Sequence, residues 1–141
     1  MEQEFELLNK IYTDTESFSK AMNLVLPKVT NPNMRKVIIG QINECDKINS
    51  DAKCEISNLG KKAKSSILSN LSATVSSKVS TIANTNDSVI AEFIIKEANN
   101  NVINITRAIN KCQNSSPTCY SLGKKLIKKD EECISNIMTF L

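Results

Sequence analysis

Apolar side chains recur every three or four positions along most of this 141-residue chain, which is the spacing of one face of an α-helix. The pattern predicts main helices near residues 3–27, 32–59, 87–112 and 117–140, and a shorter helix near residues 65–82. Each main helix would carry one apolar stripe and an opposite polar face. The sequence therefore predicts an all-α protein without a β-sheet.

Prolines mark the predicted helix ends. Pro27 closes the first helix, because the residue before a proline is pushed out of the helical conformation. Asn31-Pro32 and Ser116-Pro117 each place a capping side chain before a proline at the first helical position, where its missing N–H costs nothing. The turns that precede these two starts are short. They make the first two and the last two main helices into antiparallel hairpins.

Helices of this length suit a bundle whose members run from end to end, since ~23 to 27 helical residues span ~35 to 40 Å. A long middle segment joins the two hairpins through the predicted helical crossover, and this connectivity is that of a ferritin-like four-helix bundle. The length predicts one domain covering residues 1–141. The apolar stripe of the predicted helix near residues 117–140 also places Leu141 inward. The predicted core includes Ile38, Ile42, Ile94, Ile105, Leu126 and Ile137.

The order of these elements resembles a protein family. The Asn31-Pro32 turn, a second helix that carries Cys45 and ends in Leu59-Gly60, and a short amphipathic crossover are similar to the bacterial ferritin-like domain of unknown function 2383. The resemblance covers nearly the whole chain. It implies a single four-helix ferritin-like domain from a bacterium, with an unsettled activity and a stress- or spore-related role of the kind that ferritin-like bacterial families often have.

Histidine is absent from the chain. This chain alone therefore cannot build the Glu-x-x-His ligands of a di-iron bundle, Ser-His and Cys-His nucleophile pairs or mixed Cys/His zinc sites. It also has no Gly-rich phosphate loop, nucleophile elbow or C-x-x-C pair. We therefore expect no catalytic residues, no cofactor and no enzymatic activity. The favoured function is that of a structural or interaction protein, with an unknown protein partner or with self-association.

Mid-helix glutamates define the alternative function, a carboxylate-only metal site. The candidates are Glu16, Glu44, Glu97 and Glu132, with Glu131 as a substitute for the last. They fall near the middle of the four main helices, where ferritin-like bundles place their ligands. Oxygen ligands alone suit Ca²⁺, Mg²⁺ or Mn²⁺, but Lys47 stands three residues after Glu44, where a ferritin would have imidazole. The competing interpretation is that these glutamates face solvent or form ion pairs, as helix glutamates usually do.

A polar run in the third predicted helix has two interpretations. Glu97, Asn101 and Asn104 are spaced four and three apart and therefore share one helix face. They could form a buried, hydrogen-bonded layer that fixes the helix register. They could equally lie on a partly exposed face.

Lysines gather in two places on the expected surface. The first group is Lys124, Lys125, Lys128 and Lys129, and the second is Lys61, Lys62 and Lys64. Nucleic-acid binding usually requires more than this chain's net charge of +3, together with arginines and stacking aromatic side chains. We therefore expect solvated lysine faces and no nucleic-acid partner.

The chain begins with an acidic segment and lacks the apolar run of a secretory signal. No apolar stretch approaches the ~20 residues that cross a bilayer, so a membrane span is not expected and the cytoplasm is the expected location. The five cysteines are odd in number, which favours reduced, buried thiols. Cys112 and Cys119 flank one turn, and a disulfide between them is the less favoured alternative.

Overall fold

Four long helices make up most of the part of the chain that this computed structural model describes, residues 2–65 and 86–141. They are α1 (Glu2–Val25), α2 (Pro32–Asn58), α4 (Asp87–Lys111) and α5 (Pro117–Ile137), with short 3-10 helices η1 (Leu26–Lys28) and η2 (Met138–Phe140). No strand occurs within these ranges, which confirms the all-α prediction. The largest difference in a main helix boundary is at the end of α5. The predicted helix near residues 65–82 falls almost entirely outside the described residues.

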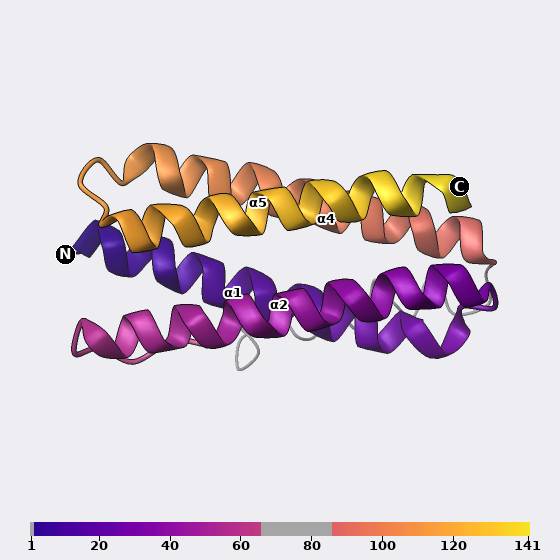
Figure 1. The fold of residues 1–141 in the computed structure, drawn as a ribbon, viewed down its shortest axis with the longest axis horizontal. Helices are drawn as coiled ribbons and strands as arrows, with labels where there is room; N and C mark the ends of the chain where they lie inside the picture. Colours follow the sequence, from indigo (N-terminus) through magenta and orange to yellow (C-terminus); the bar gives the residue numbers. More distant parts are fainter. Residues whose placement is uncertain (1, 66–85) are drawn as a thin grey trace.

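The helices pack as two antiparallel hairpins, α1 with α2 and α4 with α5 (Figure 1). The hairpins meet through α2 with α5 and through α1 with α4, and α1 also reaches α5 across the diagonal of the bundle. In Figure 1, α1 and α5 run in the same direction, and so do α2 and α4. Helix α2 therefore ends, and α4 begins, at opposite ends of the bundle.

Local side-chain chemistry explains the helix ends. The Asn31 carboxamide oxygen accepts hydrogen bonds from two first-turn N–H groups of α2 at 2.8 and 3.2 Å, and the Ser116 hydroxyl accepts one in α5 at 3.3 Å. Each cap is followed by proline at the first helical position, as predicted. Helix α2 stops at Gly60, which has a φ of 73° that only glycine adopts without strain.

The core consists of two apolar clusters, one in each half of the bundle, and all four helices contribute to both. The first cluster includes Phe18, Met22, Ile38, Cys45, Ile94, Cys133 and Ile137. The second includes Leu8, Ile11, Ile48, Ile105, Leu122 and Leu126. Burial of the six predicted core residues is confirmed: Ile38, Ile42, Ile94, Ile105, Leu126 and Ile137. The stripe pattern thus identified the helix faces that meet.

The expected inward position of Leu141 is wrong, because its side chain is 62% exposed. The α-helix ends at Ile137, and the following residues form η2. A spacing of four returns to the same face only in an α-helix, so the stripe does not continue through a 3-10 turn.

The cysteines are all free thiols in the structure, so Cys112 and Cys119 are not joined. Four of them are buried as expected: Cys45, Cys112, Cys119 and Cys133. Cys54 is exposed, which corrects the expectation of five buried thiols. It lies on α2 two residues from Ala52 and two residues from Ile56, both of which face the core. Residues two apart on a helix point to different faces, so Cys54 lies off the apolar stripe.

Candidate functional site

Two buried aspartates lie at the boundary between the apolar clusters. On α1, Asp14 stands between Ile11 of the second cluster and Phe18 of the first. On α5, Asp130 stands in the same way between Leu126 and Cys133. Asp14 and Asp130 are only 7% and 0% exposed. We call Asp14, Asp130 and the buried Gln41 of α2 the polar layer.

The sequence contains a signal for the polar layer that is separate from the candidate glutamates. Asp14 follows Ile11 by three residues, and Asp130 follows Leu126 by four. Gln41 follows Ile38 by three in the same way. Helical spacing of three and four places all of them on the inward stripes, where a polar side chain is buried with its apolar neighbours. Stripe position, rather than distance from the helix middle, identifies the buried acids.

Asp130 connects the two hairpins within the core. Its Oδ1 atom accepts a hydrogen bond of 2.9 Å from the Nε2 atom of Gln41. Its Oδ2 atom is buried and has no hydrogen-bond partner among the described residues. The pKa of Asp130 is raised to about 8, mainly by burial and also by the negative charge of Asp14, while the Gln41 hydrogen bond opposes the rise. The neutral acid is therefore the favoured form of Asp130 near neutral pH.

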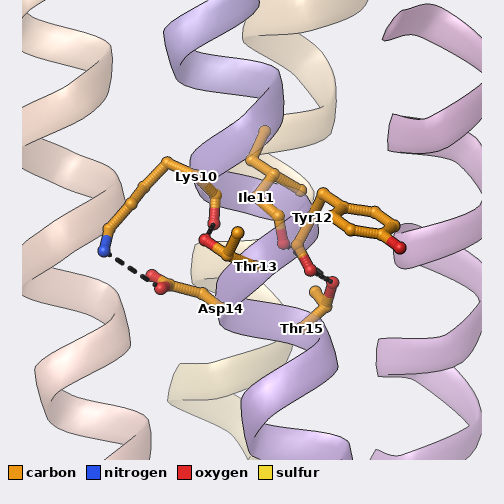
Figure 2. Close-up of polar contacts among 6 residues, drawn as sticks. All are labelled: Lys10, Ile11, Tyr12, Thr13, Asp14 and Thr15. Atoms are coloured by element: carbon orange, nitrogen blue, oxygen red, sulfur yellow. Dashed lines mark hydrogen bonds and ion pairs between the residues drawn. The ribbon is translucent and has the colours of Figure 1, made fainter. Parts of the chain in front are cut away.

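Asp14 differs from Asp130 because it has a cation beside it. Its Oδ1 atom lies 3.2 Å from the Nζ atom of Lys10, one turn earlier on α1. Figure 2 shows both side chains extending from the same side of α1, and Tyr12 pointing away from them. Burial raises the pKa of Asp14 to about 6, and Lys10 opposes that rise. The Oδ2 atom of Asp14 is also buried without a hydrogen-bond partner in the described part of the chain.

Buried thiols border the polar layer. Burial, reinforced by the charge of Asp130, raises the pKa of Cys133 to about 12. Burial also raises the pKa of Cys45 well above its ordinary value, with Asp130 and Cys133 adding to the effect. Both sulfurs therefore remain protonated thiols at neutral pH, and the reactive thiolate form is disfavoured.

Polar contacts beside the layer tie α1 to α2. The Ser19 hydroxyl donates to Asp46 at 2.8 Å, and the Asn49 amide donates to the Thr15 hydroxyl at 3.1 Å. Thr15 also donates to the carbonyl of Ile11 at 2.7 Å, within α1. These bonds satisfy the buried hydroxyl groups of Thr15 and Ser19 and hold the helix that carries Asp14.

Two of the four candidate metal ligands make structural contacts in the first hairpin. Glu16 Oε1 accepts a hydrogen bond of 2.7 Å from the hydroxyl of Ser65, in the segment that follows α2. Glu44 Oε1 lies 3.9 Å from Lys47 Nζ on the same helix. The lysine that stands where a ferritin would have a ligand is therefore an ion-pair partner of the glutamate.

The other two candidates belong to the second hairpin. Glu132 is exposed, and its Oε2 atom lies 3.6 Å from Lys129 Nζ. Glu97 is half-buried on α4. Within residues 2–65 and 86–141, no three aspartate, glutamate or cysteine side chains are grouped so that they could hold a metal ion. The structure thus does not bring the four glutamates together into one site.

The polar run of α4 follows the second of its two interpretations, a partly exposed face. Glu97, Asn101 and Asn104 are half-buried, and none is fully enclosed. Asn104 lines an open groove of about 720 Å³ between α1 and α4, together with Lys10 and Arg107. The buried polar layer is instead supplied by the other three helices.

The lysine groups lie among aromatic and acidic side chains. Lys61 Nζ lies 4.7 Å from the ring centroid of Phe5, and Lys124 Nζ lies 5.5 Å from that of Tyr120. The first group, on α5, shares its face with Glu132, the partner of Lys129. These faces therefore carry mixed charge.

Comparison of the chain with protein-family models, with curated proteins and with solved structures found no match. Among the described helices, none has both the length and the apolar character needed to span a membrane.

Proposed function

We propose that this protein is a non-catalytic four-helix bundle that works as a structural or interaction protein, binding another protein or a second copy of itself. The main support is the use made of the mid-helix carboxylates. Glu16 holds the segment after α2, while Glu44 and Glu132 pair with lysines of their own helices. Carboxylates engaged in this way stabilise the fold, whereas a metal centre would need them to converge.

The surface offers apolar groups for such a contact. The large exposed apolar residues are Leu24, Ile39, Ile103, Tyr120, Met138 and Leu141. Leu24 lies in the last turn of α1, and Met138 and Leu141 follow α5. Both helices end at the same end of the bundle (Figure 1). Exposed apolar side chains lose contact with water when a partner covers them, and this end of the bundle is therefore the favoured contact region.

The direction of the helices supports a ferritin-like connection. In a chain where α2 and α4 run the same way, the link between the hairpins joins opposite ends of the bundle. Ferritin-like bundles have one such long crossover. We accordingly propose a cytoplasmic relative of the bacterial domain of unknown function 2383, with a stress- or spore-related role.

Elemental analysis after extensive dialysis tests the non-catalytic part of the proposal. We expect no stoichiometric iron, manganese or zinc and no oxidation of added ferrous iron, because redox metals in helical bundles rely on imidazole together with carboxylates. The decisive opposite result is about one such metal per chain that is lost when Glu44 and Glu97 are replaced by glutamine. That result would establish the carboxylate-only metal site instead.

Sedimentation velocity over a range of protein concentrations tests self-association. Replacing Met138 and Leu141 with serine should weaken association, because it removes exposed apolar surface at the proposed contact region. Ile103→Ser on the middle of α4 is the control and should leave association unchanged. If the native chain stays monomeric at every concentration, self-association is wrong and only a different protein partner remains.

A further inference from the structure

We propose that Asp14 and Asp130 act together as a carboxyl pair that holds one proton inside the bundle, and that loss of this proton loosens the contact between the two hairpins. The inference goes beyond the proposed function, because it gives the bundle a built-in response to alkaline pH. It rests on where the two acids lie and on which groups surround them.

The pair lies at the junction of the hairpins. Asp14 belongs to the α1–α2 hairpin and Asp130 to the α4–α5 hairpin, and their helices touch across the diagonal of the bundle. Gln41 donates a hydrogen bond from the first hairpin to Asp130 of the second. A change in the charge of Asp130 therefore acts directly on the surface that holds the hairpins together.

Two ionised carboxylates cannot both be accommodated cheaply in this position. A buried charge needs a partner, and each acid has one buried oxygen without a hydrogen bond from the described residues. Both acids are buried on helices in contact, and like charges repel in a medium of low polarity, so the charge of Asp14 disfavours ionisation of Asp130. Lys10 lies beside Asp14 and selects it as the ionised member, which leaves the proton on Asp130. The pKa of about 6 for Asp14 is lower than the pKa of about 8 for Asp130, which agrees with Asp14 being the acid that ionises first.

The neighbouring groups of α1 and α2 leave this assignment in place. On α1, Lys10 is the cation that contacts the pair, through Asp14. On α2, Cys45 remains a neutral thiol and Asp46 accepts a hydrogen bond from the Ser19 hydroxyl. Glu16 points to a different contact, with Ser65.

The described residues of the second hairpin likewise supply no charged group that changes the assignment of the proton to Asp130. On α5, Cys133 remains a neutral thiol, and Lys129 pairs with the exposed Glu132. On α4, Glu97 is half-buried and Arg107 is exposed at the groove that Lys10 lines. The core positions of α4 nearest this level are Ala98 and Ile105, which carry no charge. The full set of charges around the pair thus favours one bound proton.

Urea unfolding of the whole chain from about pH 5 to about pH 9 tests the proposal. For native protein the urea midpoint should fall as the pH rises. In Asp130→Asn, which cannot ionise, the fall should be less than about half as large. Asp51→Asn is the control, because Asp51 is an exposed aspartate of α2, and it should keep the native pH dependence. Equal pH dependence in Asp130→Asn and native protein overturns the proposal.

A second measurement needs no variant. Unfolding of native protein near neutral pH should release about one proton, because an acid that is neutral in the fold ionises in the unfolded chain. Calorimetry in buffers of different ionisation enthalpy measures this number, and a value near zero overturns the proposal.

Ca²⁺ and Mn²⁺ are then added at about pH 9. A rise in the urea midpoint of native protein that Asp130→Asn lacks would show that a metal ion, rather than a proton, neutralises the pair.

Discussion

Individual residues on the apolar stripes decide what lies inside this bundle. Asp14 and Asp130 are buried because helical spacing puts them on the inward faces, although acids are rarely placed there. The sequence alone could have identified them by that spacing. The spacing of four on one helix also indicates Lys10 as the ion-pair partner of Asp14. The sequence could not have predicted that Gln41 reaches Asp130, because that contact joins α2 to α5 and depends on how the helices pack.

The two interior helix glycines make a residue-scale prediction, because their surroundings differ. Only Gly123 lies where two helices approach closely. A Cβ atom there would lie 3.0 Å from Ile109 Cδ1, whereas a Cβ atom at Gly40 would meet nothing within 4 Å. Gly40→Ala should raise the free energy of unfolding by about 0.5 to 1 kcal/mol through helix propensity. Gly123→Ala should gain less, because Ile109 must move. Urea unfolding of both variants checks this, and an equal gain at both positions would contradict the close packing.

At the scale of the element, sequence and structure agree well. Helix type follows from the apolar repeat. The starts of α2 and α5 follow from local chemistry, namely Asn31 or Ser116 before a proline. The C-terminal end of α5 was less predictable. The chain changes there to a 3-10 turn, which depends on packing at the end of the bundle rather than on a breaker residue.

Pairs of isoleucines on one helix test the assignment of helix faces. On α2, Ile42 is buried and Ile39 is 44% exposed, and on α4 Ile105 is buried and Ile103 is 41% exposed. Ile42→Ala and Ile105→Ala should each cost about 2 to 5 kcal/mol of unfolding free energy, because buried apolar surface is lost and a cavity remains. Ile39→Ala and Ile103→Ala should each cost less than about 1 kcal/mol. Losses below about 0.5 kcal/mol for both inward residues would mean that the faces are misassigned.

For the whole molecule, polar contacts between the hairpins fasten both ends and the middle. At one end Asp87, the first residue of α4, accepts hydrogen bonds from the backbone N–H groups of Thr30 and Asn31, each at 2.9 Å. At the other end Glu4 accepts from the backbone N–H of Ser116. The sequence predicted the two hairpins but not these contacts, since they join residues far apart in the chain. They fix how one hairpin sits on the other.

The contacts of Asp87 make a prediction for acid conditions. Its hydrogen bonds from Thr30 and Asn31 lower the pKa of Asp87 below 3.8. The stability it contributes is therefore present above pH 3.8 and is lost as the pH falls through the lowered pKa. Asp87→Ala should cost about 1 to 2 kcal/mol near neutral pH and much less in strong acid. Urea unfolding at both pH values measures the difference, and an equal cost at both would show that charge plays no part.

The stability that Asp14 and Asp130 provide changes with pH in the opposite direction to that of Asp87. Because the pKa values of Asp14 and Asp130 lie above 3.8, the stability they provide is fully present below that pH and is lost as the pH rises through about 6 and about 8. Asp87 contributes most above pH 3.8 and the buried pair most below it, so the combined contribution of these three acids is greatest near that pH. The free energy of unfolding should therefore decline on both sides of it.

The central claim is that the middle of this bundle holds a neutral, proton-bearing Asp130 rather than an ionised one. Carbon-13 NMR of the aspartate carboxyl groups, recorded on the dialysed full chain through a pH titration, tests it most directly. Asp130→Asn identifies the signal. The account predicts that the Asp130 carboxyl titrates with a pKa of about 8, far above the ordinary value of 3.8. A carboxyl that titrates near 3.8 would contradict the account, because it would mean that Asp130 is solvated or paired with a cation.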